Sequence, residues 1–514
     1  MASSYLSPGV YMEEVSSGSK PIEAAGTAVA AFVGFAEKGP SNEPVLVTNW
    51  TQFTQTFGSF IPDSYLAHAV YGYYSNGGGA AYVVRVGGNG NGAGPEAVAQ
   101  LPAAGDDAKP AFTVRALAAG SGGAKGGGDL TVEVVNVPDQ PDDVFNLVVK
   151  RGGTVVESFE GLTTRRGPTN VATVVRQQSK LITVEEATAG KGLALPRKGS
   201  EVALAPAAPA AIESVAASDY VGDSADRTGF AGLEAIDEIT MLCVPDLMAA
   251  KQRGLLDDEG VRAVQLAMIT HCELMADRVA ILDAPPGLKA QQVKQWRAEA
   301  NYDSKFAALY YPWIKVMDPL SGSPVFVPPS GHMAGIWARS DATRGVHKAP
   351  ANEVVRGAIS LEINLTKGEH DQLNPDGINC IRTFAGQGIR VWGARTLSSD
   401  PEWRYLNVRR LFNYIEKSIL NGTSWVVFEP NDHKLWDSVK RTITMFLRRV
   451  WRDGALFGQS PAQAFFVKCD EENNPPENRD VGILTVEIGV APVKPAEFVV
   501  FRISQFADGA GLEE

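Results

Sequence analysis

The middle of the chain alternates short apolar runs with stretches of helical spacing. Residues 239–246 (ITMLCVPD), 278–285 (RVAILDAP) and 305–319 (KFAALYYPWIKVMDP) are apolar almost throughout, which is typical of buried strands. Between them, residues 257–277 and 291–300 place apolar side chains at three- and four-residue steps, which predicts helices. This order predicts an α/β fold with a mixed, mostly parallel sheet that helices cover.

A different pattern occupies residues 91–215. Its margins and one internal stretch are rich in Gly, Ala and Pro, which resist regular structure and suit flexible connections. The runs DLTVEVVNV, DVFNLVVKRGGTVVESF and SKLITVEE have strand composition, with Arg151, Gly152 and Gly153 as a hairpin turn. We therefore expect a small all-β domain inserted into the α/β body, which itself takes residues 26–90 and 216–375.

The C-terminal third, residues 376–514, begins with an unusual density of arginine and aromatic residues. In SSDPEW, Ser399 or Asp400 is a possible helix cap and Pro401 a possible first helical residue. The apolar positions that follow recur at helical steps: Tyr405, Val408, Leu411, Phe412, Ile415 and Ile419. Arg409 and Arg410 leave this apolar face, so most of the aromatic residues are predicted to be core and not stacking platforms for nucleic acid.

A second C-terminal helix is predicted over residues 433–454, and it is strongly amphipathic. One face carries Leu435, Val439, Ile443, Phe446 and Val450, and the opposite face carries Lys434, Arg441, Arg448 and Arg452. At 100° per residue these four cations fall within about 40° of each other. The stripe is either an ordinary solvated face or a contact surface for an acidic partner.

Both ends of the chain have strand-like sequences next to polar linkers. Residues 481–490 alternate, with Leu484, Val486, Ile488 and Val490 on one side, and residues 497–506 predict a second strand that contains Phe498, Val499, Val500, Phe501 and Ile503. Near the start, the strand-like residues are Gly9, Val10, Tyr11, Met12 and Glu13, followed by the linker SSGSKP. Residues 1–25 are therefore interpreted as an extended arm, with an edge strand and a frayed end as the alternative.

Composition removes several classes of function. With 514 residues, 44% hydrophobic residues and a formal net charge of -12, the chain resembles soluble multidomain proteins and lacks the cationic excess of duplex-binding proteins. Neither a signal peptide nor a long apolar span is recognisable, so we expect synthesis and folding in the cytosol. The four cysteines are far apart and are expected to be core thiols.

Three aspartates keep an enzyme hypothesis open. Asp246, Asp283 and Asp318 each follow a predicted strand, where open α/β sheets bind ligands, and together they could hold Mg²⁺ or a nucleotide. The alternative is turn and helix-cap chemistry. No GxSxG or HExxH motif is present, and the loops GGNGNG (87–92) and GGAKGGG (122–128) match neither phosphate-binding fingerprint. We therefore expect no catalytic residue, metal or cofactor.

Several long motifs, in one order, resemble the contractile phage tail sheath protein family. They are PGVYMEEV (8–15), TAVAAFVGFAEKGPSNEPVLVTNWTQFTQTFG (27–58), YYPWIKVMDP (310–319), SGHMAGIWARSDATRGVHKAPAN (330–352), WGARTLSSDPEWRYLNVRRLFNYIEKSI (392–419) and PAEFVVFRI (495–503). The resemblance covers both ends and the α/β core, about three quarters of the chain. The inserted β segment resembles the family only in its position along the chain, not in its sequence.

The resemblance implies a structural subunit of a phage tail, an R-type tailocin or a phage-like contractile injection system, and no enzyme. Such subunits form helically stacked six-fold rings around an inner tube, with baseplate and terminal cap proteins as further partners. Contraction drives the tube through a target envelope, without nucleic-acid binding or stable membrane insertion. The resemblance also implies assembly in the bacterial cytoplasm, into a particle that stays in the cell or is released on lysis. In this setting the terminal strands named above are expected to be exchanged between subunits, and the basic stripe to face the inner tube.

Overall fold

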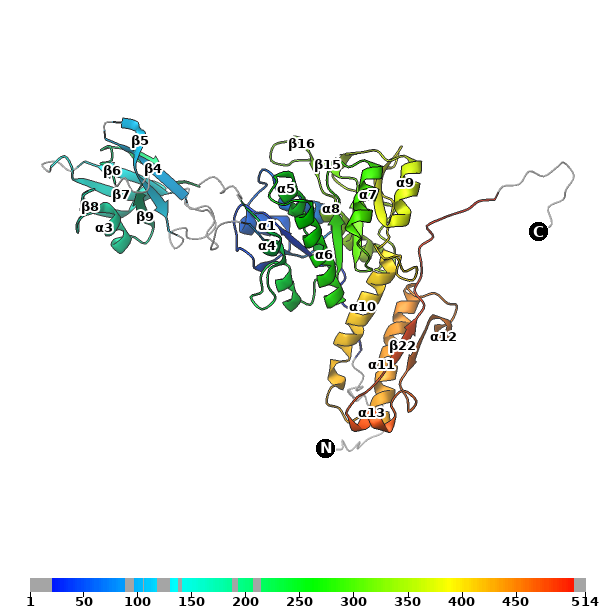
Figure 1. Ribbon diagram of the computed structural model, residues 1–514. Coiled ribbons are helices and arrows are strands. Elements are labelled where there is room, and N and C mark those ends of the chain that lie inside the picture. Colours follow the sequence, from blue (N-terminus) through cyan, green and yellow to red (C-terminus); the bar gives the residue numbers. More distant parts are fainter. Residues whose placement is uncertain are drawn as a thin grey trace, which may run out of the picture.

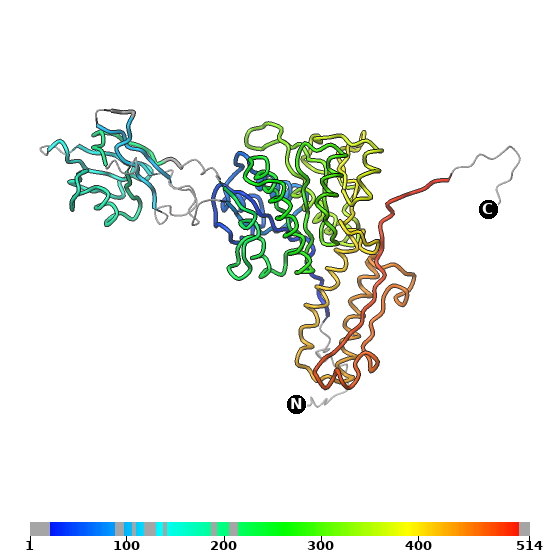
Figure 2. Tube along the Cα trace, in the orientation of Figure 1, coloured from blue at the N-terminus to red at the C-terminus, as the bar shows by residue number. Residues whose placement is uncertain are grey.

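The structure is a computed structural model that describes residues 21–87, 97–104, 106–117, 130–136, 141–186, 193–206 and 214–502. Three regions are visible in Figure 1: a β-rich lobe, a central α/β body, and a C-terminal region that projects from the body. The backbone trace in Figure 2 shows the last described residues leading away from the body as an extended tail. The expected strand residues Gly9 to Glu13 and Ile503 lie outside the described residues, as do residues 88–92 and 122–128 of the two glycine loops.

A mixed, mostly parallel sheet forms the centre of the body, as the sequence predicts, and it has nine strands. Its order is β17 (Glu353–Val354), β20 (Gly388–Val391), β19 (Ile378–Phe384), β14 (Ala307–Tyr311), β13 (Val279–Asp283), β12 (Met241–Cys243), β1 (Ala30–Gly34), β3 (Ala81–Arg85) and β2 (Pro44–Val47). The strands from β19 to β3 pair in parallel, and the outer strands pair antiparallel. The structure places β19 and β20 in this sheet, so the body sheet extends past the expected boundary at residue 375.

Two hydrophobic cores lie on opposite faces of this sheet. In β1, Ala31 and Val33 belong to one core, and Ala30 and Phe32 belong to the other. The first core contains residues of α5 (Asp246–Gln252), α6 (Asp258–Met275) and α7 (Ala290–Ala300), and the second contains residues of α1 (Trp50–Phe57), α2 (Leu66–Asn76) and α8 (Ser330–Arg344). Both faces of the central strands are covered, which explains why their sequences are apolar without alternation.

The predicted strand 305–319 is in fact two strands in two different sheets. After β14, the chain passes Pro312 and enters β15 (Ile314–Met317), which pairs antiparallel with β16 (Pro324–Val327) and β18 (Ala358–Leu361). Proline has no N–H to donate to a sheet ladder, so pairing with the body sheet stops there. Short elements complete the body: α4 (Ala217–Val221), η2 (Ala231–Ala235), α9 (Lys367–Leu373) and η3 (Asn374–Asp376).

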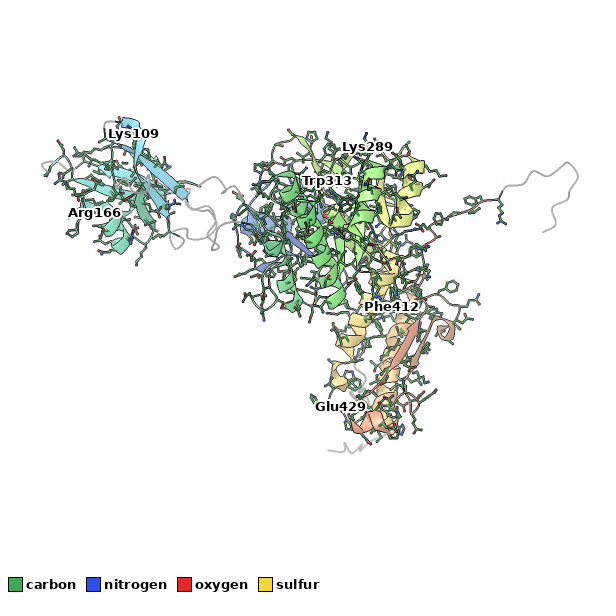
Figure 3. The ribbon with its side chains drawn as sticks, in the orientation of Figure 1. Lys109, Arg166, Lys289, Trp313, Phe412 and Glu429 are labelled. Atoms are coloured by element: carbon green, nitrogen blue, oxygen red, sulfur yellow. The ribbon has the colours of Figure 1, made fainter. Side chains whose placement is uncertain are left out.

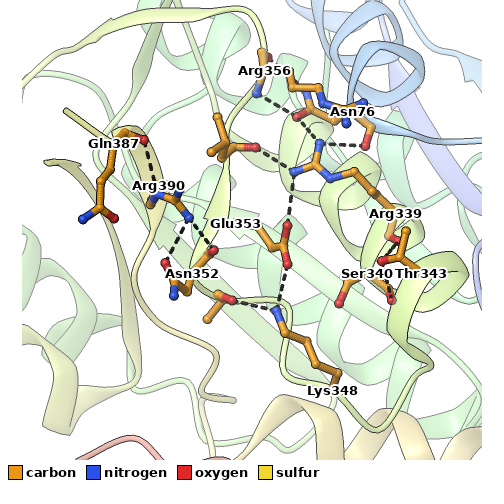
Figure 4. Close-up of polar contacts among 12 residues, drawn as sticks. Asn76, Arg339, Ser340, Thr343, Lys348, Asn352, Glu353, Arg356, Gln387 and Arg390 are labelled. Atoms are coloured by element: carbon orange, nitrogen blue, oxygen red, sulfur yellow. Dashed lines mark hydrogen bonds and ion pairs between the residues drawn. The ribbon is translucent and has the colours of Figure 1, made fainter.

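The antiparallel end of the body sheet is fixed by a polar network (Figure 4). Arg339 of α8 donates hydrogen bonds to the carbonyls of Asn76 (3.1 Å) and Val354 (2.7 Å). Lys348 pairs with Glu353 at 2.9 Å. These contacts join α2, α8 and the short strand β17, which has only two residues and little packing of its own.

The β-rich lobe consists of two four-stranded sheets around one core. One sheet has the order β10 (Glu201–Ala203), β6 (Leu130–Val135), β7 (Phe145–Arg151), β8 (Thr154–Leu162), and the other has β11 (Ala205–Pro206), β4 (Ala97–Ala103), β5 (Asp106–Ala116), β9 (Ile182–Glu186). Gly152 and Gly153 form the predicted hairpin turn, both with positive φ. Strand β4 falls within the margin that we expected to be unstructured, because its alanines pack into the lobe core. The helix α3 (Val171–Gln178) is a further addition to the predicted all-β lobe.

The C-terminal region is built on two long helices, α10 (Leu406–Gly422) and α11 (His433–Arg452). It also contains η4 (Ser424–Val426), α12 (Pro461–Ala464), α13 (Pro476–Asp480), β21 (Phe465–Lys468) and β22 (Glu487–Val490). Figure 3 shows Phe412 near the junction with the body and Glu429 at the far end. No helix in the described ranges is long and apolar enough to cross a membrane.

Helix α10 begins later than predicted. Residues 401–403 form a turn, in which the Asp400 carboxylate accepts the N–H of Glu402 at 2.9 Å. The backbone around Tyr405 is extended because it pairs with Arg395, and Leu406 donates its N–H to the Ala394 carbonyl at 3.0 Å. This pairing prevents helical backbone before Leu406, so the predicted cap at Ser399 or Asp400 is wrong.

Asp246 and Asp283 fasten helices to strand ends. Asp246, at the start of α5, accepts the N–H groups of Phe35 (2.6 Å) and Tyr65 and the hydroxyl of Ser64 (3.0 Å). Burial raises its pKa to about 6. Asp283, at the end of β13, accepts the N–H of Ser330 at the start of α8 (2.9 Å).

Asp318 occupies the turn between β15 and β16. Its carboxylate accepts the N–H of Leu320 (3.0 Å) and the hydroxyl of Ser321 (2.6 Å). Within the described part of the chain, no three His, Cys, Asp or Glu residues are grouped so that they could hold a metal ion. All four cysteines are free and buried, as expected.

Asp283 provides a test of how its burial affects stability. Burial raises its pKa from 3.8 to about 7, so the folded state keeps a proton that the unfolded chain loses. The resulting stabilisation is complete below pH 3.8 and disappears as the pH rises through about 7. The free energy of unfolding of Asp283→Asn, relative to wild type, should therefore be higher at pH 8 than at pH 5 by on the order of 3 kcal/mol, because the wild-type carboxyl is protonated in the folded state at pH 5 and ionised at pH 8.

Thermal unfolding at pH 5, 6.5 and 8 measures this difference. The matched control is Asp371→Asn, which changes an exposed carboxylate on α9. Equal effects of Asp283→Asn at pH 5 and pH 8 would contradict the assignment of a raised pKa to Asp283.

Candidate assembly interface

The amphipathic pattern of α11 is confirmed on its apolar side. The predicted apolar residues are all buried, and they form a core with α10 and the strands β21 and β22: Leu435, Val439, Ile443, Phe446 and Val450. The Asp432 carboxylate caps the helix by accepting the N–H of Leu435 at 2.9 Å. The face opposite this core is therefore directed away from the subunit.

The four predicted cations lie on that outer face. Lys434, Arg441, Arg448 and Arg452 are all exposed, and no ion pair or hydrogen bond joins any of their side chains to another described residue. Arg449, in contrast, is used internally, because its guanidinium donates to the Ile22 carbonyl at 3.0 Å. We refer to the four exposed cations as the basic stripe.

The strand predicted over residues 481–490 forms only in part. Only Glu487–Val490 pairs, antiparallel with Phe465–Lys468, so Ile488 lies in a strand while Leu484 and Val486 precede it. The earlier residues have other partners: Asn474 exchanges two hydrogen bonds with the backbone of Thr485 (2.7 and 2.9 Å). The two strands β21 and β22 form a sheet by themselves, so this sheet has open edges among the described residues.

The described part of the chain after residue 496 contains no strand. Residues 497–502, part of the second predicted strand, pair with nothing described, and four large apolar side chains remain 67–84% exposed: Phe498, Val499, Val500 and Phe501. The sequence of these residues suits a β-strand, but a strand forms only where a second strand is available to pair with it. The segment from Phe498 to Phe501 is therefore apolar and extended, and it joins no sheet of its own subunit.

The N-terminal segment is seated on the C-terminal region, which the sequence pattern did not indicate. Ile22 is 3% exposed within the α10–α11 core, and Ala25 donates its N–H to the Ser418 hydroxyl at 3.0 Å. Gly422 makes room for this contact, because a Cβ there would lie 2.6 Å from Cγ1 of Ile22. Ile22 is a single apolar residue in a polar segment, and its partner Gly422 is far away in the sequence. No local pattern of apolar positions could therefore predict this contact.

Arg410 is buried, against the sequence expectation that it leaves the packed face. Its guanidinium forms two hydrogen bonds with Asp341 of α8 (2.6 and 2.9 Å) and donates to the Thr27 carbonyl at 3.0 Å. It also lies over the Trp337 ring at 4.8 Å. Arg410 is only 4% exposed, because α10 packs against the body as well as against α11.

Arg409 is buried too, at 3% exposure. It donates to Asn413 at 2.7 Å and to Glu416 at 3.1 Å, and it lies over the Trp403 ring at 4.6 Å. The guanidinium groups of Arg409 and Arg410 thus have partners within the chain. Arg410 joins α10 to α8 of the body, whereas the hydrogen bonds of Arg409 stay within α10.

Two family models match consecutive parts of the chain. Residues 230–397 match the phage tail sheath protein central domain, and residues 398–506 match the phage tail sheath C-terminal domain. Together they cover residues 230–506, which is more than half of the 514 residues.

Curated relatives agree with these matches. The tail sheath protein of Vibrio phage KVP40 is 30% identical over 193 residues, which is 37% of this chain and 28% of that protein. The tail sheath protein of Burkholderia phage BcepMu is 29% identical over 239 residues, or 44% of this chain and 49% of that protein. The chain thus aligns with half or less of the length of these two relatives.

Solved structures extend the similarity to the fold of nearly the whole chain. The helical sheath of the anti-feeding prophage (AFP) in its contracted state matches with a TM-score of 0.58 at 24% identity, covering 97% of this chain and 99% of that one. The sheath of an extracellular contractile injection system, PVC, also in its contracted state, matches with a TM-score of 0.57 at 22% identity and 98% coverage of both chains. With two family models matching in sequence order and a shared fold, the chain belongs to the phage tail sheath protein family.

Proposed function

We propose that this chain is a structural subunit of a contractile sheath, in a phage tail or a related injection machine. The observation that carries the proposal is the tail from Phe498 to Phe501, which exposes four consecutive large apolar side chains. An isolated soluble subunit gains nothing from such a tail, whereas a polymer can bury it in each neighbour. The solved relatives named above are sheaths in a contracted state, which agrees with this function.

The arms are proposed to be exchanged between subunits. Residues 8–15 and 497–506 would each add a strand to the open β21–β22 sheet of a neighbour, next to Leu484, Val486 and Ile488. Main-chain hydrogen bonds give such a joint strength, and the linkers SSGSKP and APVKP let the joined bodies rotate. The subunits could then turn during contraction without separating.

The basic stripe is proposed to contact the inner tube. Four exposed cations without partners among the described residues, on a chain of net charge -12, favour contact with an acidic surface, which we place on the inner tube. Exposed charge pairs contribute at most about 1 kcal/mol each, so such contacts can hold the tube in register and still release during contraction.

The remaining parts of the proposal follow from the family. Subunits would form stacked six-fold rings that end at baseplate and cap proteins, assembled in the bacterial cytoplasm as part of a phage or phage-like particle. No enzymatic step, nucleotide, metal or nucleic acid enters this mechanism, because the energy of contraction is stored in subunit interfaces. The β-rich lobe, residues 91–215, is proposed to lie on the outer surface.

Electron microscopy of particles from cells that produce the whole machine tests the function directly. Rods with a sheath around a tube, which shorten and widen on triggering, are expected. Discrete particles without helical order would contradict the proposal.

The exchange of arms predicts the effect of truncation. Removal of residues 1–18, or of everything after Glu497, should leave the body folded with a melting temperature within a few degrees of wild type. Neither truncated chain should build long sheaths, because strand addition at the open sheet is lost. Sheath length in negative stain is the measurement, and normal sheaths from either truncation would refute exchange at that end.

The basic stripe predicts the effect of charge reversal. Arg441→Glu with Arg448→Glu should reduce tube-filled sheaths at least about tenfold, since two of the four charge pairs, each worth up to about 1 kcal/mol, become repulsive. The matched control is Lys289→Glu with Lys440→Glu, which makes the same change in net charge at exposed positions outside the stripe. Equal numbers of tube-filled sheaths in both variants would exclude the stripe as the tube contact.

The β-rich lobe predicts tolerance to deletion. Replacement of residues 91–213 by a short Gly/Ser linker should leave the melting temperature of the body nearly unchanged, because the lobe has a hydrophobic core of its own. Sheaths should still form and should be thinner in cross-section. Complete loss of sheaths from a variant with a folded body would show that the lobe makes essential contacts.

A further inference from the structure

The chain is hydrogen-bonded to the rest of the subunit up to residue 493, before it enters the exposed tail. Before it becomes exposed, Ala491 donates its N–H to the Ala464 carbonyl at 2.8 Å, and Val493 donates to the Ala455 carbonyl at 3.2 Å. The Asn407 side chain donates to the Val493 carbonyl at 3.1 Å. From residue 494 to residue 497 the described backbone hydrogen bonds to the rest of the subunit cease, and only a side chain holds the tail.

That side chain is Glu497, whose carboxylate accepts four hydrogen bonds. Arg395 provides two of them, from Nε at 2.9 Å and from Nη2 at 2.7 Å, in a bidentate arrangement. Asn374 donates from Nδ2 at 2.8 Å, and the Tyr405 hydroxyl donates at 3.1 Å. Burial alone would raise the pKa of the Glu497 carboxyl, but these hydrogen bonds outweigh it and lower the pKa, so the group stays ionised.

Arg395 is itself held firmly to the body sheet. Its backbone N–H donates to Oδ1 of Asn379 at 2.7 Å, and its carbonyl accepts from Nδ2 of the same residue at 2.8 Å. Its Nη1 donates to the Asn374 carbonyl at 3.1 Å. Asn379 is fully buried in β19, a strand within the nine-stranded sheet, so the contact to Glu497 is anchored in the core of the body.

Packing does not fix the tail at this point. Residues 493–499 line one side of a cavity of about 860 Å³, and His347, Arg382 and Asn407 are among the residues that line the rest of it. A backbone that crosses an open cavity can take several directions unless a specific contact selects one. The Glu497 carboxylate supplies that contact, and the next residue, Phe498, is already 73% exposed.

We propose that Glu497 and Arg395 form a clamp that fixes the point and the direction in which the C-terminal arm leaves the subunit. The hinge of the arm then lies directly after Glu497. Force on an exchanged arm is transmitted to β19 through the bidentate contact between Glu497 and Arg395. Glu497 and Arg395 are positioning residues in this account. The inference rests on the proposed exchange of the arm between subunits.

A spin label on the tail tests the clamp in the soluble subunit. Because all four native cysteines are buried, Ala496→Cys, at an exposed position, accepts a single nitroxide label. We expect an immobilised spectrum in the parent chain and at least a threefold faster component after Glu497→Ala, with Glu497→Gln intermediate because it keeps one acceptor. A label at Val499→Cys should be mobile in every variant.

Two controls separate the clamp from general damage to the fold. Lys494→Gln changes an exposed charge on the same tail and should leave the label at position 496 immobilised. Arg395→Gln should mobilise the label as Glu497→Ala does, provided that its melting temperature stays near the parent value. An unchanged label in Glu497→Ala would overturn the proposal.

Assembly is the second readout, measured on the same variants without the label. Glu497→Ala should give at least about fivefold fewer sheaths of wild-type length, with a wider spread of helical pitch. Normal sheaths from a variant with a mobile label would also overturn the clamp, because the arm would then need no fixed direction.

The chain truncated after Glu497 distinguishes the clamp from the exchange on which it rests. This chain keeps the carboxylate and loses the arm. Normal sheaths from it would refute arm exchange, while an immobilised label at position 496 in the same chain would still support the local contact.

Discussion

The buried ion pair between Arg410 and Asp341 determines where the C-terminal region stands relative to the body. Both side chains are at most 5% exposed, so each charge depends on the other for compensation. Removal of one partner from such a pair typically costs about 3–5 kcal/mol, because an unpaired charge stays buried. The position of α10 set by this pair in turn places α11, the basic stripe and the β21–β22 sheet.

Arginine contacts also join other parts of the subunit. Arg410 joins α10 to α8, Arg395 joins the tail to β19 through Glu497, and Arg449 joins α11 to the N-terminal segment through the Ile22 carbonyl. Arg410 and Arg395 each bind both oxygens of a carboxylate through a planar guanidinium, which fixes direction as well as distance. The subunit is therefore held together by directed contacts inside, while the apolar side chains of Phe498 to Phe501 and the basic stripe remain exposed. This division suits a polymer that changes state through interfaces between rigid subunits.

The sheet body provides the stiffness that this division needs. Its central strands are buried on both faces between two separate hydrophobic cores, and Asp246 and Asp283 fasten helices to strand ends by hydrogen bonds from backbone N–H groups. These carboxylates occupy the positions where an α/β enzyme would bind its ligand, and here they serve the fold. The β-rich lobe adds a core of its own, so its folding does not depend on the body.

The sequence by itself determined the features that depend on local periodicity: the parallel strands, the hairpin at Gly152 and Gly153, the two faces of α11 and the family resemblance. The tertiary structure alone decided the burial of Arg409 and Arg410, the late start of α10 at Leu406 and the clamp at Glu497. The periodicity of apolar residues identifies one buried face of a helix. Helix α10 packs against both α11 and the body, and its contact with the body involves residues that are distant in sequence. A strand sequence likewise states what a segment can pair with but not where the partner is, so residues 497–502 are strand-like in sequence and unpaired in the isolated subunit.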